Sequence, residues 1–152
     1  MTFKKNLLLS TLVAVSFSLA VYYHQNAPVQ VIDVYHEKNF SDVLVLNFPD
    51  ADHAKITWWL KNRAMLAKGY SVPHPSDEGD FTVTFWDFKD GYIQDDGSDI
   101  LCFHQASPVP RCIKKNAVLE VSSSNDGTLI FRVYDGTYIL EKNGAVVKID
   151  DR

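Results

Sequence analysis

Residues 80–103 read DFTVTFWDFKDGYIQDDGSDILCF, and this stretch decides the fold that we expect. Its first residues alternate between the two faces of a strand, with Phe81, Val83 and Phe85 on one face and Thr82, Thr84, Trp86 and Phe88 on the other. Aromatic and β-branched side chains at period two are typical of a central, half-buried strand. The Asp90-Gly91 pair that follows predicts a two-residue hairpin turn, because both turn positions favour positive φ.

Two more strands are predicted on the N-terminal side of this stretch. Val29–His36 and Phe40–Phe48 are rich in β-branched and aromatic residues, and a polar turn of three residues pairs them as a hairpin. In the first strand, alternation places Val29, Val31, Asp33 and Tyr35 on one face and Ile32 and Val34 on the other.

One long helix is predicted after this hairpin. Asp50 or Asp52 can cap its start, and it runs to about Lys68, with Gly69 in the left-handed position that ends many helices. Its apolar face at helical spacing comprises Ile56, Trp59, Leu60, Arg63 and Ala67, with Leu66 beside them. Trp58 lies off this face, and we expect it either to pack against a loop or to be an exposed anchor for a partner.

Four alternating runs separated by Asp-Gly or Asn-Gly turns form the C-terminal part of the chain. They are Ala117–Ser122, Thr128–Tyr134, Thr137–Glu141 and Ala145–Ile149. Such a series predicts a β-meander. The expected class is therefore α+β, with a predominantly antiparallel sheet, a C-terminal meander and one long helix packed on the sheet.

The two cysteines, Cys102 and Cys112, are spaced for a disulfide across a hairpin. Two short strands, Ile100–Phe103 and Arg111–Lys114, flank a turn that contains two prolines, so the sulfurs come to lie opposite each other. Their spacing matches no metal-ligand pattern. Two unpaired buried thiols are the alternative, and a redox-active pair is disfavoured because there is no CxxC motif.

The first 25 residues form a membrane anchor or a signal segment. Lys4 and Lys5 precede an uncharged, mostly apolar run from Leu7 to Tyr23, which is long enough to span a bilayer. Ser18-Leu19-Ala20 offers the alternative, a signal peptide cleavage site. In both cases the lysines stay in the cytoplasm. Residues 26–152 then form one exported α+β domain, either tethered to the inner membrane by a single pass or released into the periplasm.

Charge argues against nucleic acid as a partner. The chain has a formal charge of −4, and the part after Tyr23 is two units more negative because Lys4 and Lys5 precede it. An acidic domain repels a phosphate backbone. The sequence also lacks an HExxH motif, a GxSxG elbow and a glycine-rich phosphate loop, so we expect no catalytic, cofactor or metal site.

An acidic cluster is the one constellation with candidate chemistry, and it consists of Asp87, Asp90, Asp95, Asp96 and Asp99. Five carboxylates near a turn suit a hard cation, but the full calcium-loop pattern and its terminal glutamate are missing. Solvated turn residues explain the cluster more simply. A third interpretation is a surface that docks a basic partner, with Trp58, Asp87, Asp90 and Tyr92 as candidate binding residues.

Ordered motifs along nearly the whole chain resemble those of an enterobacterial membrane protein family, domain-of-unknown-function family 943. The residues that carry the resemblance are Asn47-Phe48-Pro49, Lys55-Ile56, Trp58 to Asn62, Tyr70 to Pro75, Phe85 to Phe88, Asp90-Gly91-Tyr92, Leu101-Cys102-Phe103, Cys112-Ile113 and Tyr134 to Tyr138. The resemblance implies an envelope location and an exported domain with paired cysteines. It implies no activity and no catalytic residues.

Three function classes are compatible with these features. The first is a membrane-tethered, non-enzymatic protein-binding module in the periplasm, for instance an immunity-type protein that blocks a toxin. The second is an envelope interaction or assembly module. The third is a periplasmic hydrolase, which would need paired carboxylates in a deep pocket.

Overall fold

The computed structural model describes residues 15–16, 27–94, 97–104, 111–124 and 126–149. The elements are β1 Gln30–Glu37, β2 Phe40–Leu46, α2 Asp52–Tyr70, β3 Phe81–Asp87, β4 Ile100–Phe103, β5 Arg111–Lys114, β6 Ala117–Ser123, β7 Leu129–Val133, β8 Gly136–Leu140 and β9 Val146–Ile149. The predicted anchor or signal segment, residues 1–25, lies outside this description apart from Val15 and Ser16. None of the described helices has the length and apolar character needed to cross a membrane.

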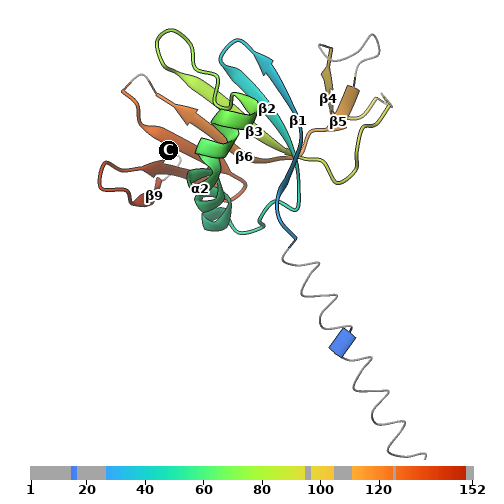
Figure 1. Cartoon of the computed structure of the whole chain (residues 1–152), viewed down its shortest axis with the longest axis horizontal. Helices are drawn as coiled ribbons and strands as arrows, with labels where there is room; N and C mark the ends of the chain where they lie inside the picture. Colours follow the sequence, from blue (N-terminus) through green and yellow to red (C-terminus); the bar gives the residue numbers. More distant parts are fainter. Residues whose placement is uncertain (1–14, 17–26, 95–96, 105–110, 125, 150–152) are drawn as a thin grey trace, which may run out of the picture.

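Seven strands form one sheet in the order β1-β2-β3-β6-β7-β8-β9, and α2 covers one of its faces (Figure 1). Only β2 and β3 pair in parallel, because the chain crosses back through α2 between them. All the other pairs are antiparallel, and β6 to β9 form the predicted meander. The α+β prediction is confirmed, for a mixed, mostly antiparallel sheet.

Strand β3 lies inside this sheet because both of its faces are covered. Val83 and Phe85 are fully buried in the core beneath α2, as their alternation predicts. Trp86 and Phe88 project to the opposite face and pack against a second, smaller core around Leu44. The sheet therefore separates two apolar clusters, one under α2 and one under the β4–β5 hairpin.

The predicted hairpin at Asp90-Gly91 is wrong. The Gly91 N–H does close a turn onto the Phe88 carbonyl at 2.9 Å, but only Gly91 of the pair has positive φ. The neighbours of β3 are β2 and β6, so the chain leaves the sheet after this turn. Because β3 is buried on both faces, it pairs with the strands that bury its side chains, and these are β2 and β6, not the segment that follows it in the sequence.

A β-bulge in β1 overturns the predicted alternation of that strand. The pairing with β2 shifts register between Val31 and Asp33. Val31 and Val34 therefore both pack against the core beneath α2, whereas Tyr35 is buried in the core on the other face. The extra residue of a bulge changes the phase of all residues after it.

Helix α2 also differs from its prediction at both ends. The N-cap is Ala51, which makes no side-chain hydrogen bond, so neither Asp50 nor Asp52 caps the helix. The helix continues through Gly69 and ends at Tyr70, and the C-cap Ser71 has φ 57° and donates its N–H to the Ala67 carbonyl. After these two added residues Val72 enters the core, where it is fully buried, and this burial outweighs the preference for glycine at a helix end.

The buried face of α2 is narrower than the predicted one. Ile56, Trp59 and Leu66 are buried, but Arg63 and Ala67 of the expected face are exposed. A straight helix on a twisted sheet touches it along a narrow stripe, which leaves these two side chains beyond the contact.

Candidate functional site

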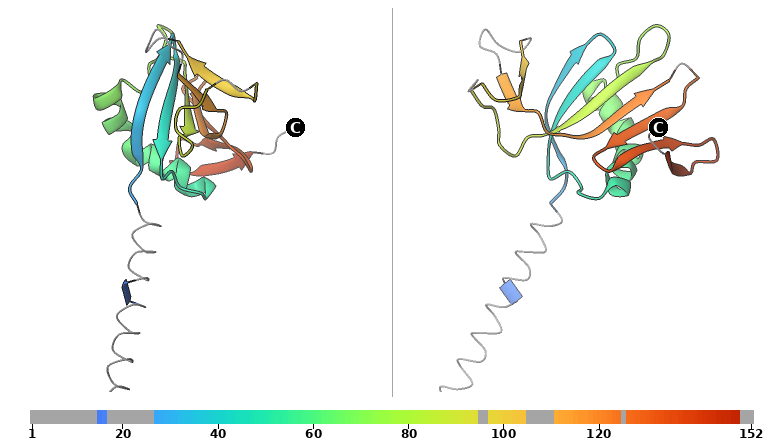
Figure 2. Two further views of the ribbon diagram at one scale, coloured as in Figure 1. Left: turned by 90° about the vertical axis from the view of Figure 1, so that its right-hand side faces the viewer. Right: turned by 180° about the vertical axis from the view of Figure 1, so that it is seen from behind.

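A disulfide-linked hairpin stands apart from the main sheet, and we call it the arm (β4 and β5). Cys102 and Cys112 are directly opposite in its register and are bonded to each other. The predicted disulfide is therefore confirmed. The connection between the strands, residues 105–110, lies outside the described residues. The arm lies on the face of the sheet opposite to α2, as the left view of Figure 2 shows.

Aromatic stacking attaches the arm to the sheet. The Tyr35 ring lies parallel to the Phe103 ring, with 4.0 Å between centroids, and both side chains are buried. Leu44 from β2 and Ile113 from β5 complete this small core. The β1 bulge makes the attachment possible, because it turns Tyr35 towards the arm.

A polar cluster around Asp33 reinforces this attachment, and we call it the Asp33 clamp (Asp33, Tyr35, Tyr92 and Arg111). The Tyr35 and Tyr92 hydroxyls each donate to Asp33 Oδ2 at 2.9 Å and lie 2.8 Å apart. Arg111 lies 3.4 Å from the same oxygen, with its guanidinium 5.2 Å from the centre of the Tyr92 ring. One carboxylate thus joins β1, the segment after β3 and the arm.

Partial burial is the main reason why the pKa of the Tyr92 hydroxyl is raised, and its hydrogen bonds to Tyr35 and Asp33 add to the effect. The phenol therefore stays protonated and remains a donor at physiological pH. Tyr92 was predicted to bind a partner, but its hydroxyl serves the attachment of the arm. Its side chain is still 38% exposed, so the ring remains accessible from solvent.

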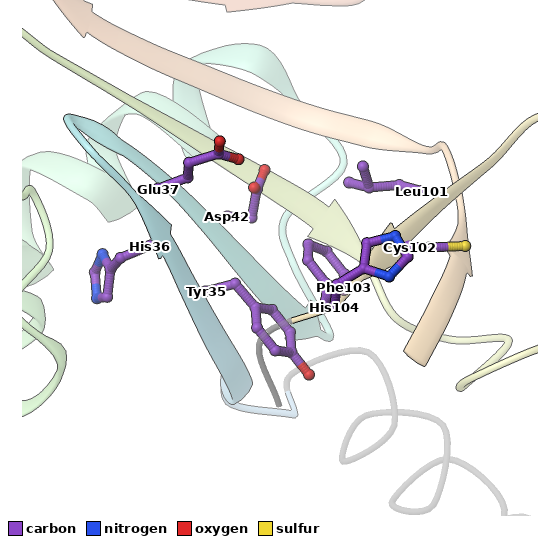
Figure 3. Close-up of a pocket in the computed structure, with 8 residues that line it drawn as sticks. All are labelled: Tyr35, His36, Glu37, Asp42, Leu101, Cys102, Phe103 and His104. Atoms are coloured by element: carbon purple, nitrogen blue, oxygen red, sulfur yellow. The ribbon is translucent and has the colours of Figure 1, made fainter. Parts of the chain in front are cut away.

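A cleft of about 350 Å³ lies between the arm and the strands β1 and β2, and we call it the arm cleft. It is lined by Tyr35, His36, Glu37, Asp42, Leu101, Cys102, Phe103 and His104 (Figure 3). The stacked rings of Tyr35 and Phe103 lie together, and the Glu37 and Asp42 carboxyl groups lie near each other on the sheet side. The cleft combines an aromatic wall with acidic groups.

The two carboxyl groups of the arm cleft have no lysine or arginine partner among the described residues. Asp42 accepts a hydrogen bond from the Trp86 indole N–H at 2.7 Å. Burial raises the pKa of the Asp42 carboxyl, the indole N–H opposes this shift and the nearby Glu37 adds to it. Among the described residues lining the cleft there is no lysine or arginine, and neither acid forms an ion pair there.

The two histidines of the cleft differ in what they offer a ligand. His36 points away from the cleft (Figure 3). Its Nε2 lies 3.0 Å from the Tyr70 carbonyl and so carries the proton, while Nδ1 accepts from the Ser41 hydroxyl at 3.0 Å. His104 is exposed at the arm. Within the described parts of the chain, no group of three or more His, Cys, Asp or Glu is arranged to hold a metal.

The predicted acidic surface has a different character, and we call it the lysine-paired patch. Its ion pairs are Asp87 with Lys89 at 3.1 Å, Asp90 with Lys114 at 3.0 Å and Asp99 with Lys115 at 2.7 Å. Asp95 and Asp96 lie outside the described residues. Each described carboxylate of the patch thus has a lysine beside it that offsets its charge.

Trp58 is not part of the same surface as Asp87, Asp90 and Tyr92. It is half-buried on the α2 side of the sheet, where it packs edge-on against Phe48 and Phe85, with 5.1 and 5.8 Å between ring centroids. The first of the two expectations for Trp58, partial burial, agrees with this position. Two hollows nevertheless open on either side of its indole.

Apart from Tyr92 and Cys102, which were singled out for other roles, sequence reasoning missed the residues of the arm cleft and of the Asp33 clamp. Asp42 interrupts an otherwise apolar strand, and a lone carboxylate among buried neighbours is a signal that could have been followed. Asp33 sits in a similar apolar run. The cleft itself could not be predicted, because it depends on where the arm packs.

The comparison with protein families matches residues 2–150 to the family described as enterobacterial putative membrane protein (DUF943). Because the match covers almost the whole chain, the chain belongs to this family, and the resemblance noted from its motifs is confirmed. Comparisons with curated proteins and with solved structures gave no match. The family description names a putative membrane protein and assigns no activity.

Proposed function

We propose that this DUF943 member is a non-enzymatic protein-binding module, tethered to the inner membrane with its folded domain in the periplasm. We propose further that it is an immunity-type protein, which binds and blocks a toxin in that compartment. The family description supports the membrane attachment. The Cys102–Cys112 disulfide supports the oxidising side of the membrane, since such bonds are rare in the cytoplasm.

One observation carries the binding proposal: within the described residues the carboxylates of the arm cleft form no ion pair, whereas those of the patch each have a lysine. Desolvating Asp42 without a cation costs stability, as its raised pKa indicates. A lysine or arginine of a partner entering the cleft would remove this cost and could also contact the Tyr35 and Phe103 rings. The negative charge of the domain would speed the approach of a basic partner.

The composition of the cleft favours binding over catalysis. Among its described lining residues there is no serine, threonine or lysine to act as a nucleophile. Its one cysteine, Cys102, is held in the disulfide. We therefore propose that the two carboxylates recognise a cation and do not form the acid–base pair of a hydrolase.

Capture of partners by the full chain from envelope extract tests the proposal. The cleft variant Glu37→Gln/Asp42→Asn should lose a partner that the wild type captures. The matched patch variant Asp87→Asn/Asp90→Asn removes the same number of charges and should capture that partner normally. Equal capture by all three proteins would overturn the role of the cleft.

A second measurement separates an immunity-type protein from an envelope assembly module. The captured partner is expressed in the periplasm of cells with and without the wild-type chain. Growth arrest that the wild type relieves and the cleft variant does not relieve supports the immunity role. A partner that is harmless when expressed alone contradicts it and favours assembly.

A further inference from the structure

We propose that α2 rests on an anionic phospholipid surface through four side chains at helical spacing, Trp58, Lys61, Met65 and Lys68, which we call the α2 stripe. This inference uses the membrane attachment of the proposed function but not the protein partner. It concerns the face of the molecule opposite to the arm cleft.

Lys61, Met65 and Lys68 of the α2 stripe lie on the exposed side of the helix, and the half-buried Trp58 lies at its edge, next to the core. Residues three or four positions apart share one helical face, and Trp58, Lys61, Met65 and Lys68 follow this spacing. Lys61 and Lys68 are exposed, and Met65 is 45% exposed. The core side of the same helix is formed by other residues, among them the fully buried Leu66.

The exposed charges of α2 are all positive, in a domain whose net charge is negative. Lys61, Arg63 and Lys68 form no ion pair within the described part of the chain. Asp52, the single acid of the helix, lies 3.8 Å from Lys55 and also accepts a hydrogen bond from the Tyr138 hydroxyl at 3.3 Å. The cationic face is therefore complementary to anionic headgroups.

The α2 stripe lies beside the point where the folded domain begins. One hollow next to Trp58, of about 500 Å³, is lined by Ala27, Pro28 and Val29 together with Asn62 and Met65. Ala27 lies four positions after Tyr23, the end of the apolar run. Four residues span at most about 14 Å, so a chain anchored by that run keeps the stripe close to the headgroups.

The residue types of the α2 stripe suit a membrane–water interface. An indole ring prefers the headgroup level, a methionine side chain can enter the acyl boundary, and lysine stems extend along apolar surface to place their ammonium groups beside phosphates. Because α2 and the arm lie on opposite faces of the sheet, this orientation leaves the arm cleft open to the periplasm (Figure 2).

Quenching of tryptophan emission by brominated lipids tests the inference on the full chain reconstituted into vesicles. Trp58→Phe measures the contribution of Trp58, since Trp59 is only 1% exposed and Trp86 lies on the other face of the sheet. In vesicles of phosphatidylcholine and phosphatidylglycerol, we expect strong quenching that falls by at least half in Trp58→Phe. In pure phosphatidylcholine we expect weak quenching for both proteins.

Charge reversal identifies the lysines that matter. Lys61→Glu/Lys68→Glu should reduce quenching in the anionic vesicles to the level seen in phosphatidylcholine, whereas the matched control Lys38→Glu/Lys142→Glu, in exposed turns, should leave it unchanged. If the reversal unfolds the domain, the neutral Lys61→Gln/Lys68→Gln takes its place and should reduce quenching by about half.

Equal quenching in the two kinds of vesicle, or no effect of the stripe variants, overturns the inference. The latter result would assign the stripe to a protein contact. A chain that is washed off both kinds of vesicle at high salt contradicts the membrane tether of the proposed function. A chain that is retained without Trp58 quenching contradicts the α2 stripe alone.

Discussion

The arm cleft and the lysine-paired patch are both built from acidic residues, yet only one of them keeps its charge unpaired. In the patch, Asp87, Asp90 and Asp99 each face a lysine at 2.7 to 3.1 Å. In the cleft, Asp42 accepts from the Trp86 indole N–H, Glu37 is exposed, and neither forms an ion pair with a described residue. A partly buried carboxylate without an ion pair lowers the stability of the fold and can bind a cationic ligand. An exposed carboxylate beside a lysine has little effect on stability, and its charge is already offset.

Removal of the disulfide should give the largest effect, because it releases one wall of the cleft. Cys102→Ser/Cys112→Ser should lower the free energy of unfolding by about 2–4 kcal/mol. Chemical denaturation of both proteins measures the difference, and mass spectrometry of the unreduced wild type checks the bond. Equal denaturation midpoints would mean that the Tyr35–Phe103 stack and the Asp33 clamp hold the arm without it.

Loss of one hydroxyl from the Asp33 clamp should have the next largest effect. Tyr35→Phe keeps the stacked ring but removes the hydroxyl that hydrogen-bonds Asp33 and Tyr92. The free energy of unfolding should fall by about 1–2 kcal/mol. Tyr134→Phe is the matched control, because Tyr134 is 95% exposed. A similar loss in both variants would show that the clamp does not hold the arm.

Neutralising Asp42 should stabilise the protein while it weakens binding. Because burial raises the pKa of Asp42 in the folded state, the folded protein binds this proton more tightly than the unfolded chain does. The stability contributed by Asp42 therefore falls as the pH rises through the folded pKa. Asp42→Asn, which can still accept from Trp86, should be more stable than the wild type at pH 7, and the gain should disappear as the pH falls below the ordinary aspartate value.

Denaturation of both proteins at pH 7 and at about pH 3.5, just below the ordinary aspartate pKa, checks this expectation. Asp87→Asn serves as the control from the patch, and it should not become more stable at pH 7. A loss of stability in Asp42→Asn at pH 7 would contradict the view that the cleft carboxylate lacks compensation.

The ion pairs of the lysine-paired patch should give the smallest effects. Asp90→Asn and Asp99→Asn should each change stability by less than about 1 kcal/mol, because both pairs are largely exposed to solvent. The change should shrink further in 0.5 M salt. A loss as large as that of the clamp variant would mean that the patch, and not the clamp, secures the arm.

The fold was largely predictable because its strongest signals are local. The alternation from Phe81 to Phe85 determines which side chains enter the core, and the Asp-Gly and Asn-Gly turns define the meander. The bulge before Asp33 was not predictable from alternation, since it adds one residue without any change of composition.

The candidate site was less predictable because its contacts are long-range. Asp90 pairs with Lys114 and Asp33 joins Arg111, and no spacing rule links residues so far apart in sequence. The sequence therefore indicated an acidic surface at the patch, where the charges turn out to be compensated. Asp42, which forms no ion pair with a described residue, lies within a strand that the sequence predicts, Phe40–Phe48.

The place of the arm in the chain gives it an evolutionary freedom that the sheet lacks. Strands β3 and β6 are antiparallel neighbours, and the Asp87 N–H donates to the Asn116 carbonyl at 3.0 Å where the arm leaves the sheet and returns. Residues 88–115 therefore form one excursion between neighbouring positions of β3 and β6, so a change in its length would not shift the register of these strands. Exchange of this segment would replace Leu101 to His104 of the cleft lining and leave the strand order of the sheet as it is.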